Sequence, residues 1–512
     1  MQNPGSKPTE PSSATPSEVA LPGEAQRPAT GIRPENVIYP IAILCSILNW
    51  FFALRSPLWL DETVSYWQIT AGFSQLWARQ GISFVAYPFL LLVTKSLFGS
   101  SIYALRMPSI LAMLAAVYFL YRIARQLFDV DVAGFVTVIF CLYPPLMFAA
   151  IDARPYAFAV LAVTVAIDRM LRWTRSGSTR DAVWFGISAA LILYFHFLFG
   201  IVVAAFAIYL LMVARQRPDS FHPDWKAALI PFCVVLLPVV PLILKIVTTT
   251  GEHVFYQRAT LSDLAGSFAT DYLRALFMLA ALIAAAMSRV RAPRPAHEGT
   301  RTLPLLLAFV PLLAFFVLSA ATPIHMFVSR YYLVAVPGIA LCWGLMVSCF
   351  DSRWLRAALC LSVVVAMTAV DYDPGFSTPH GYTWKYALEV AETNTAVDHA
   401  PLLICSDIPE SDRLTSPFDS QSGMLAPLSY YKVSSPVVGL PRSVTPLAQR
   451  EIDQFLQQMT ARRQRFLVVA YEPSWATIRY LVGVTDKTYT HHPIGVYDRV
   501  GLVEFSPRPS AP

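Results

Sequence analysis

Long apolar runs recur along this chain, and they restrict its fold more than any other feature of the sequence. A helix needs about 20 mostly apolar residues to cross a bilayer. Runs that approach or reach this length lie near residues 37–54, 107–121, 132–150, 156–171, 182–196, 198–214, 227–247, 272–288, 303–321, 331–350 and 355–370. Only 14% of the residues are charged, whereas soluble domains carry about 25%. The sequence therefore predicts a polytopic α-helical membrane protein with about eleven transmembrane helices.

Arginines in alternate connectors indicate how these helices are oriented. Arginine-rich connectors cover residues 172–180, 215–218, 288–295 and 353–356. Such loops stay on the cytoplasmic side, so we expect a bacterial-type inner-membrane protein with a cytoplasmic N-terminus and an outer C-terminal region. This arrangement requires that segment 84–99, which is short and contains Pro88 and Lys95, does not cross the membrane. We interpret it as an interfacial helix within a first external loop, residues 55–106.

The two ends of the chain differ from the apolar part, which we place at residues 37–371. Residues 1–36 are rich in Pro, Ser, Ala and Thr and hold few large apolar side chains, so we expect a disordered cytoplasmic tail. Residues 372–512 are more polar, and short apolar segments such as 401–407 flank a helical pattern. This pattern predicts an extracytoplasmic α/β domain.

Charge and motifs exclude several classes of function. The net charge of +6 comes largely from the arginine-rich connectors, so it does not indicate nucleic-acid binding. No phosphate-binding Walker loop, GxGxxG sequence or zinc-type spacing of Cys and His is present.

Ionisable side chains occupy the connectors that the predicted topology places outside. They are Asp61 and Glu62, Arg106, Asp152 and Arg154, His196, His325, and Arg330. Charged groups at membrane depth are costly and usually face a cavity or a partner. Because these residues share one side of the membrane, we predict that they form a polar site at its outer surface.

Purely structural roles are also open for these residues. The alternatives are helix capping by Asp61 and Glu62, a turn held by Asp152 and Arg154, interfacial snorkelling of Arg106 or Arg330, and simple packing of His196.

Five segments in order resemble the GT-C superfamily of membrane glycosyltransferases. The similarity is to the branch that contains protein O-mannosyltransferases, lipid A aminoarabinose transferases and bacterial galacturonosyl and mannosyl transferases. The segments are residues 57–67 (PLWLDETVSYW), 87–128, 152–158 (DARPYAF), 194–200 (YFHFLFG) and 329–338 (SRYYLVAVPG). The resemblance implies a GT-C fold and a sugar donor linked to a polyprenyl phosphate, which is used on the extracytoplasmic face.

The resemblance also implies roles for individual residues. Asp61 matches the first-loop acid that activates or positions the acceptor, Glu62 matches its neighbour, and Asp152 matches a second acid. Relatives differ in their need for metal, so Asp61 with Asp152 could hold a divalent cation or act without one.

Basic residues are expected near the phosphate of the donor. Where many relatives have a basic residue or histidine before the proline of the re-entrant segment, this chain has Tyr87 beside Pro88. The predicted set for donor and substrate binding is Arg106, Arg154, His196, Arg330, Tyr87 and Lys95.

We therefore expect a glycosyltransferase that moves a hexosyl or pentosyl group from a polyprenyl-phosphate donor to a glycolipid, polysaccharide or protein. A carboxylate would activate the acceptor opposite the departing phosphate, and arginine would stabilise the charge that develops on that phosphate. One alternative is a transporter or lipid flippase without bond cleavage, although the interiors of the apolar runs are nearly uncharged. Another is a scaffold subunit, which has no need of charged groups on every outer connector.

Overall fold

The computed structural model describes residues 34–70, 72, 86–218, 221–241, 244, 258–268, 271–287, 301–322, 325–371, 384–406, 425–440, 444, 446–471 and 475–509. The tail predicted for residues 1–36 lies outside this set except for its last three residues, which begin the first helix.

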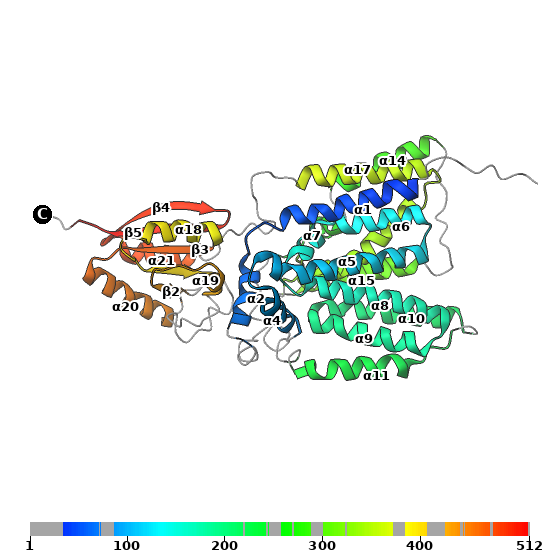
Figure 1. The fold of residues 1–512 in the computed structure, drawn as a ribbon, viewed down its shortest axis with the longest axis horizontal. Helices are drawn as coiled ribbons and strands as arrows, with labels where there is room; N and C mark the ends of the chain where they lie inside the picture. The colour runs from blue at the N-terminus through cyan, green and yellow to red at the C-terminus, as the bar shows by residue number, and fades with distance from the viewer. Residues whose placement is uncertain are drawn as a thin grey trace, which may run out of the picture. The chain divides into compact units, whose positions relative to one another are not determined.

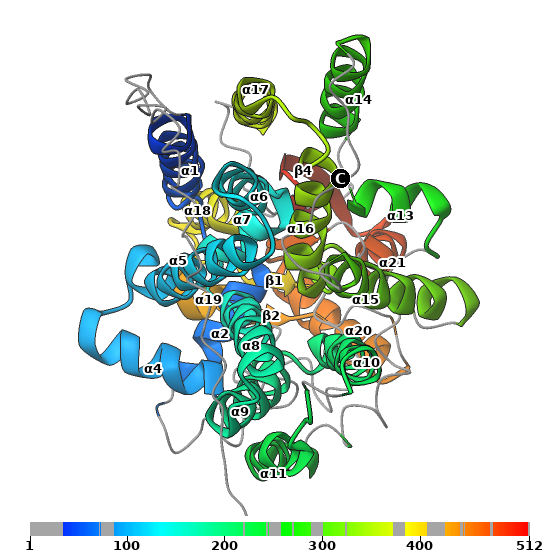
Figure 2. The same cartoon turned by 90° about the vertical axis from the view of Figure 1, so that its right-hand side faces the viewer.

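Within the described residues, the apolar runs of the sequence fall on helices, and most of these helices run side by side in one bundle (Figures 1 and 2). The helices are α1 (Pro34–Ala53), α5 (Ile102–Leu127), α6 (Val130–Leu142), α7 (Pro144–Ile151), α8 (Tyr156–Ser176), α9 (Thr179–Phe195), η1 (Phe197–Ile201), α10 (Val202–Gln216), α11 (Trp225–Leu236), η2 (Leu237–Val239), α14 (Asp271–Ala286), α15 (Thr302–Ala321), η4 (Tyr332–Ala335), α16 (Val336–Val347) and α17 (Arg353–Asp371). A further short helix, α13 (Leu261–Phe268), precedes α14.

Length and composition identify only some of these helices as membrane spans. Within the described ranges, four are long and apolar enough, namely α1, α5, η1 with α10, and α15. The helices α6 and α7 would make a fifth if they form one span that bends by 67°. The prediction of a multi-pass helical membrane protein is thus confirmed, whereas the number of eleven spans is not.

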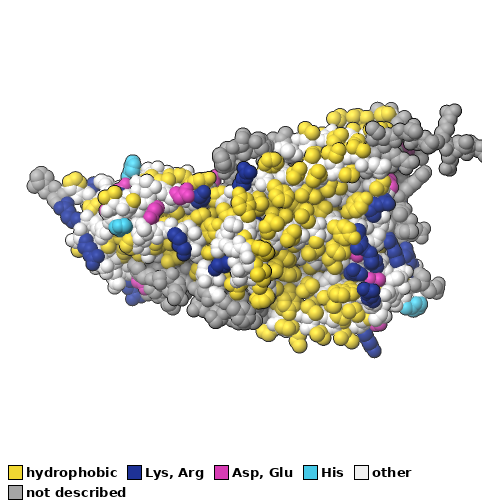
Figure 3. All heavy atoms as spheres, viewed as in Figure 1, with side chains coloured by type: hydrophobic (Ala, Val, Ile, Leu, Met, Phe, Trp, Pro, Cys, Tyr) yellow, Lys and Arg dark blue, Asp and Glu magenta, His cyan; other side chains and the backbone are white. Residues whose placement is uncertain are grey.

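The surface of the bundle agrees with a membrane location. Hydrophobic side chains cover the face of the bundle that is visible in Figure 3, and Lys and Arg side chains gather at the end far from the β-sheet. At least part of this basic end is neutralised internally. The carboxylate of Asp168 is fully buried and forms ion pairs with two arginines. Its Oδ1 lies 3.3 Å from Arg122 Nη2, and its Oδ2 lies 3.2 Å from Arg172 Nε.

The described residues of the first loop, between α1 and α5, include two short helices. They are α2 (Leu60–Thr70) and α4 (Ala86–Phe98). With 13 residues, α4 is shorter than the length of about 20 residues that crosses a bilayer. It buries Tyr87 and Leu91 and exposes apolar side chains such as Phe89 and Leu97. Its position at the membrane interface stays a prediction.

The C-terminal region forms the predicted α/β fold around a five-stranded mixed sheet. The strands are β1 (Leu402–Cys405), β2 (Val437–Gly439), β3 (Phe466–Tyr471), β4 (Tyr489–Tyr497) and β5 (Val500–Pro507), in the order β2-β1-β3-β5-β4. The pairs β1–β2 and β1–β3 are parallel, and the pairs β3–β5 and β5–β4 are antiparallel. The predicted domain boundary at residue 371 coincides with the end of α17 and remains a prediction.

Helices cover both faces of this sheet, which explains why β1 and β3 are apolar throughout. Leu402 and Ile404 face a cluster that includes α18 (Trp384–Thr395). Leu403 and Cys405 face the opposite cluster, which includes α20 (Pro446–Arg462) and α21 (Trp475–Thr485). Because successive residues of a strand point to opposite faces, a strand that is buried on both sides carries an unbroken apolar run.

Candidate active site

A buried ion pair anchors the start of the first loop helix, α2. Glu62 in its first turn is 1% exposed and pairs with Arg106 of α5, which is also 1% exposed. Arg106 donates from Nε to Glu62 Oε1 at 2.7 Å and from Nη2 to Glu62 Oε2 at 2.5 Å. Two peptide N–H groups, of Trp59 and Ala153, donate to the same carboxylate at 3.2 and 2.8 Å. Four donors therefore converge on Glu62.

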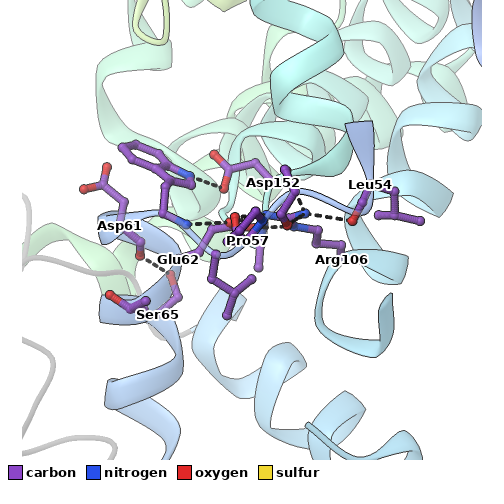
Figure 4. Close-up of polar contacts among 12 residues, drawn as sticks. Leu54, Pro57, Asp61, Glu62, Ser65, Arg106 and Asp152 are labelled. Atoms are coloured by element: carbon purple, nitrogen blue, oxygen red, sulfur yellow. Dashed lines mark hydrogen bonds and ion pairs between the residues drawn. The ribbon is translucent and has the colours of Figure 1, made fainter. Parts of the chain in front are cut away.

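Arg106 also holds the segment that joins α1 to α2. Its Nη1 donates to the carbonyl oxygens of Leu54 and Ser56 at 2.9 and 2.8 Å, and its Nη2 donates to the carbonyl of Pro57 at 3.1 Å. Figure 4 shows the Arg106 side chain close to Glu62, Pro57 and Leu54. Each of the three guanidinium nitrogens is thus hydrogen-bonded within the protein. We call the pair of Glu62 and Arg106, with these bonds, the buried clamp, because it fixes the loop to α5.

Asp152 lies beside this clamp, in the connector between α7 and α8. It is 2% exposed, and its Oδ1 accepts a hydrogen bond from Trp59 Nε1 at 3.0 Å. Burial, and next the negative charge of Glu62, raise the pKa of the Asp152 carboxyl well above its usual value. Pro144 lacks a peptide N–H, so α6 ends just before it and α7 begins there. The short helix α7 then ends at Ile151, one residue before Asp152.

Asp61 has a different environment from its neighbour Glu62. Its Oδ2 lies 3.0 Å from Arg330 Nη1 and 3.8 Å from Arg154 Nη2. Arg154 also donates to the Asp61 carbonyl and to Ser65 Oγ, at 3.3 and 3.2 Å. The side chains of Asp61, Arg154 and Arg330 are 24%, 19% and 27% exposed. In Figure 4 the Asp61 carboxylate points away from the buried clamp.

His196 lies between α9 and η1, surrounded by aromatic rings. Its ring centroid is 4.6 Å from that of Phe199, 5.3 Å from Tyr156 and 5.7 Å from Tyr331. Burial, followed by the positive charges of Arg154 and Arg330, lowers the pKa of His196 to about 3. The imidazole is therefore neutral near pH 7, and it cannot supply a positive charge to a phosphate.

The remaining predicted residues, Tyr87 and Lys95, are on α4. Tyr87 is buried, its ring packs against Phe158 at 5.9 Å, and burial followed by the charge of Asp152 raises the pKa of its hydroxyl. The Nζ of Lys95 lies 5.1 Å from the centroid of the Tyr66 ring. The structure thus brings Asp61, Arg154 and Arg330 together, sets Glu62, Arg106 and Asp152 beside them, and gives Tyr87 and Lys95 contacts of their own.

The residues around Asp61 do not suit a divalent cation. Two guanidinium groups already lie against its carboxylate, and they would repel a metal ion. No group of three or more His, Cys, Asp or Glu side chains that could hold a metal is found among the described residues. The arrangement instead suits a partly exposed base beside two cations that can bind an anionic group.

Part of the sequence matches a known protein family, and the fold is similar to solved structures. Residues 85–244 match the family described as dolichyl-phosphate-mannose-protein mannosyltransferase. The fold is similar to that of ArnT from Cupriavidus metallidurans, in a crystal structure bound to undecaprenyl phosphate and in one of the apo state. The TM-scores are 0.55 and 0.53, and both matches have 11% sequence identity and cover 91% of this chain and 97% of ArnT.

A search of curated proteins gave no significant match. The family match covers the segment from α4 to α11, which contributes Arg106, Asp152 and Arg154, and the structural likeness extends over most of the chain. These findings agree with the resemblance seen in the sequence: residues 85–244 match a mannosyltransferase family, and the fold is similar to that of ArnT.

Proposed function

We propose that the protein transfers one sugar from a polyprenyl-phosphate donor to an acceptor on the extracytoplasmic side of the membrane, with Asp61 as the base that activates the acceptor. The main support is the cluster of Asp61 with Arg154 and Arg330, which joins a partly exposed carboxylate to two cations. The donor class rests on the sequence resemblance and on the likeness to ArnT, which has been crystallised with undecaprenyl phosphate.

The proposed reaction is a single displacement. Asp61 accepts the proton of an acceptor hydroxyl, while the oxygen of that hydroxyl attacks the anomeric carbon of the donor sugar. The bond between that carbon and the phosphate oxygen breaks, and polyprenyl phosphate leaves with one additional negative charge. Arg154 and Arg330 stabilise this charge, because a guanidinium group offers paired N–H donors to phosphate oxygens.

Asp61 is a better candidate for the base than its neighbour Glu62. The Glu62 carboxylate already accepts four hydrogen bonds and is buried, so a substrate hydroxyl has no access to it. Arg106 is likewise committed to Glu62 and to the loop carbonyls. We therefore assign Glu62 and Arg106 to the positioning of the loop, and Asp152 to its support through Trp59.

The proposed topology follows the charge distribution of the sequence. It has eleven spans, a cytoplasmic N-terminus, and both the first loop and the C-terminal domain outside the cell membrane. The basic end of the bundle in Figure 3, far from the β-sheet, supports this orientation, since arginine-rich loops remain in the cytoplasm.

Replacement of Asp61 with asparagine tests the assignment of the base. Purified full-length protein would be given a radiolabelled polyprenyl-phosphate sugar and a mixture of envelope acceptors. We expect Asp61→Asn to fold normally and to lose about 10²- to 10⁴-fold in transfer rate, the usual contribution of a general base. Asp486→Asn, which changes an exposed acid of the C-terminal domain, is the matched control.

Full turnover in the Asp61→Asn variant would show that another group activates the acceptor. Movement of the labelled lipid across a vesicle membrane without release of polyprenyl phosphate would instead favour the alternative of a flippase.

A further inference from the structure

A short segment of the C-terminal domain lies against the first loop at the start of α2. Helix α19 (Ala426–Tyr430) and the residue after it pack on α2 (Figure 1). The hydroxyl of Tyr431 donates a hydrogen bond to the carbonyl oxygen of Leu58 at 3.1 Å. The ring of Tyr430 meets the ring of Tyr66 edge to face, with centroids 5.2 Å apart.

The carbonyl that Tyr431 binds belongs to the same turn that the buried clamp holds. Arg106 binds the carbonyls of Ser56 and Pro57, the two residues before Leu58. The residue after Leu58 is Trp59, whose peptide N–H donates to Glu62 and whose indole donates to Asp152. Three successive carbonyls are therefore fixed, two by the helical bundle and the third by the C-terminal domain.

We propose that Tyr431 is a positioning residue through which the C-terminal domain holds the catalytic loop in its working geometry. The proposal rests on the assignment of Asp61 as the base, which stands three residues after Leu58, at the start of α2. The Leu58 side chain is fully buried, so its carbonyl has little water to replace a lost hydroxyl. Small shifts of a base relative to its substrate lower the rate of reaction steeply.

Tyr431→Phe removes the hydroxyl and keeps the ring. Because one hydrogen bond contributes about 1 kcal/mol, we expect roughly a fivefold lower kcat, with a much smaller change in KM for the polyprenyl-phosphate sugar. Tyr480→Phe is the matched control. It removes a tyrosine hydroxyl of the same domain that donates to Asp453 at 2.7 Å, so it should leave kcat unchanged.

Hydrogen–deuterium exchange gives a readout that does not depend on activity. The peptide that covers residues 56–63 contains the N–H of Trp59, which donates to Glu62, and that of Thr63, which donates to the Trp59 carbonyl at 3.0 Å. We expect this peptide to exchange faster in Tyr431→Phe than in the wild-type protein, and not in Tyr480→Phe.

The outcomes separate this inference from the proposed function. If Asp61→Asn keeps full turnover while Tyr431→Phe accelerates exchange and lowers kcat, the base assignment fails and the positioning role of Tyr431 stands. If Tyr431→Phe matches Tyr480→Phe in exchange and in kcat, Tyr431 does not position the loop. Faster exchange with an unchanged kcat would also overturn the proposal, because the contact would then support only the fold.

Discussion

Replacement of Glu62 with glutamine tests whether Glu62 and Arg106 position the loop, as the structure indicates, or take part in substrate chemistry, as the sequence suggested. Glutamine has nearly the shape of glutamate, but it has one acceptor oxygen and one donor NH₂ group in place of two acceptor oxygens. In the wild-type protein each carboxylate oxygen accepts two hydrogen bonds, one from Arg106 and one from a peptide N–H. In either orientation of the amide, the glutamine NH₂ would therefore face two other donors, one N–H of Arg106 and one peptide N–H, and could not bond to either.

The loss of charge adds to this mismatch. Arg106 is 1% exposed and its guanidinium group would remain buried beside a neutral partner. Removal of one member of a buried ion pair costs about 3–5 kcal/mol, because the charge that remains is uncompensated. We therefore expect Glu62→Gln to lower the free energy of unfolding by about this amount, and transfer activity to fall with the folded fraction.

Unfolding in a denaturant titration of the detergent-solubilised protein would measure this change. Glu504→Gln is the matched control, because Glu504 accepts from Arg465 at 3.0 Å in a pair that is about one-fifth exposed. A pair of this kind contributes at most about 1 kcal/mol. A change below 1 kcal/mol in Glu62→Gln would refute the reasoning. So would an Arg106→Lys variant of wild-type stability with a raised KM for the donor, since Arg106 would then bind the phosphate.

Two further predictions concern acidity and metal. Burial and the charge of Glu62 raise the pKa of Asp152 above 3.8 in the folded protein. The wild type should therefore lose stability as pH rises from about 4 toward that raised pKa. The Asp152→Asn variant should not show this loss. Unfolding midpoints of both proteins between pH 4 and pH 8 would measure this, and a difference that is independent of pH contradicts it. Because arginines flank Asp61, transfer should persist after chelation and dialysis, and loss of activity that Mg²⁺ or Mn²⁺ restores would show a metal requirement.

The helices were largely predictable from the sequence, because a long apolar run in a membrane protein has few alternatives to a helix. The third run, residues 132–150, is the exception in detail. It was predicted as one span, but it forms α6 and α7, which meet at a bend of 67°. The sequence held the signal for this break, since Pro144 and Pro145 lie at the start of α7, and proline ends a preceding helix.

The members of the site were predictable, but their partners were not. Side chains with charges on one side of the membrane could be expected to meet, and Asp61, Arg154 and Arg330 do so although Arg330 follows Asp61 by 269 residues. The links made by Trp59 and Tyr431 could not be predicted, because they depend on long-range packing. The hydrogen bond from Tyr431 to Leu58 spans 373 residues, and no local pattern marks either end.

The adjacent acids Asp61 and Glu62 show how a helix places two similar side chains in different environments. Successive side chains on an α-helix point about 100° apart, so the first turn of α2 directs one acid inward and the other toward the partly exposed arginines. The position of Asp61 depends on Glu62. The buried pair of Glu62 with Arg106 fixes the first turn, and that turn in turn sets where the carboxylate of Asp61 lies. A charge buried at high cost is therefore explained by what it positions. Asp152 also has a positioning role, since it accepts a hydrogen bond from Trp59 in the turn before α2.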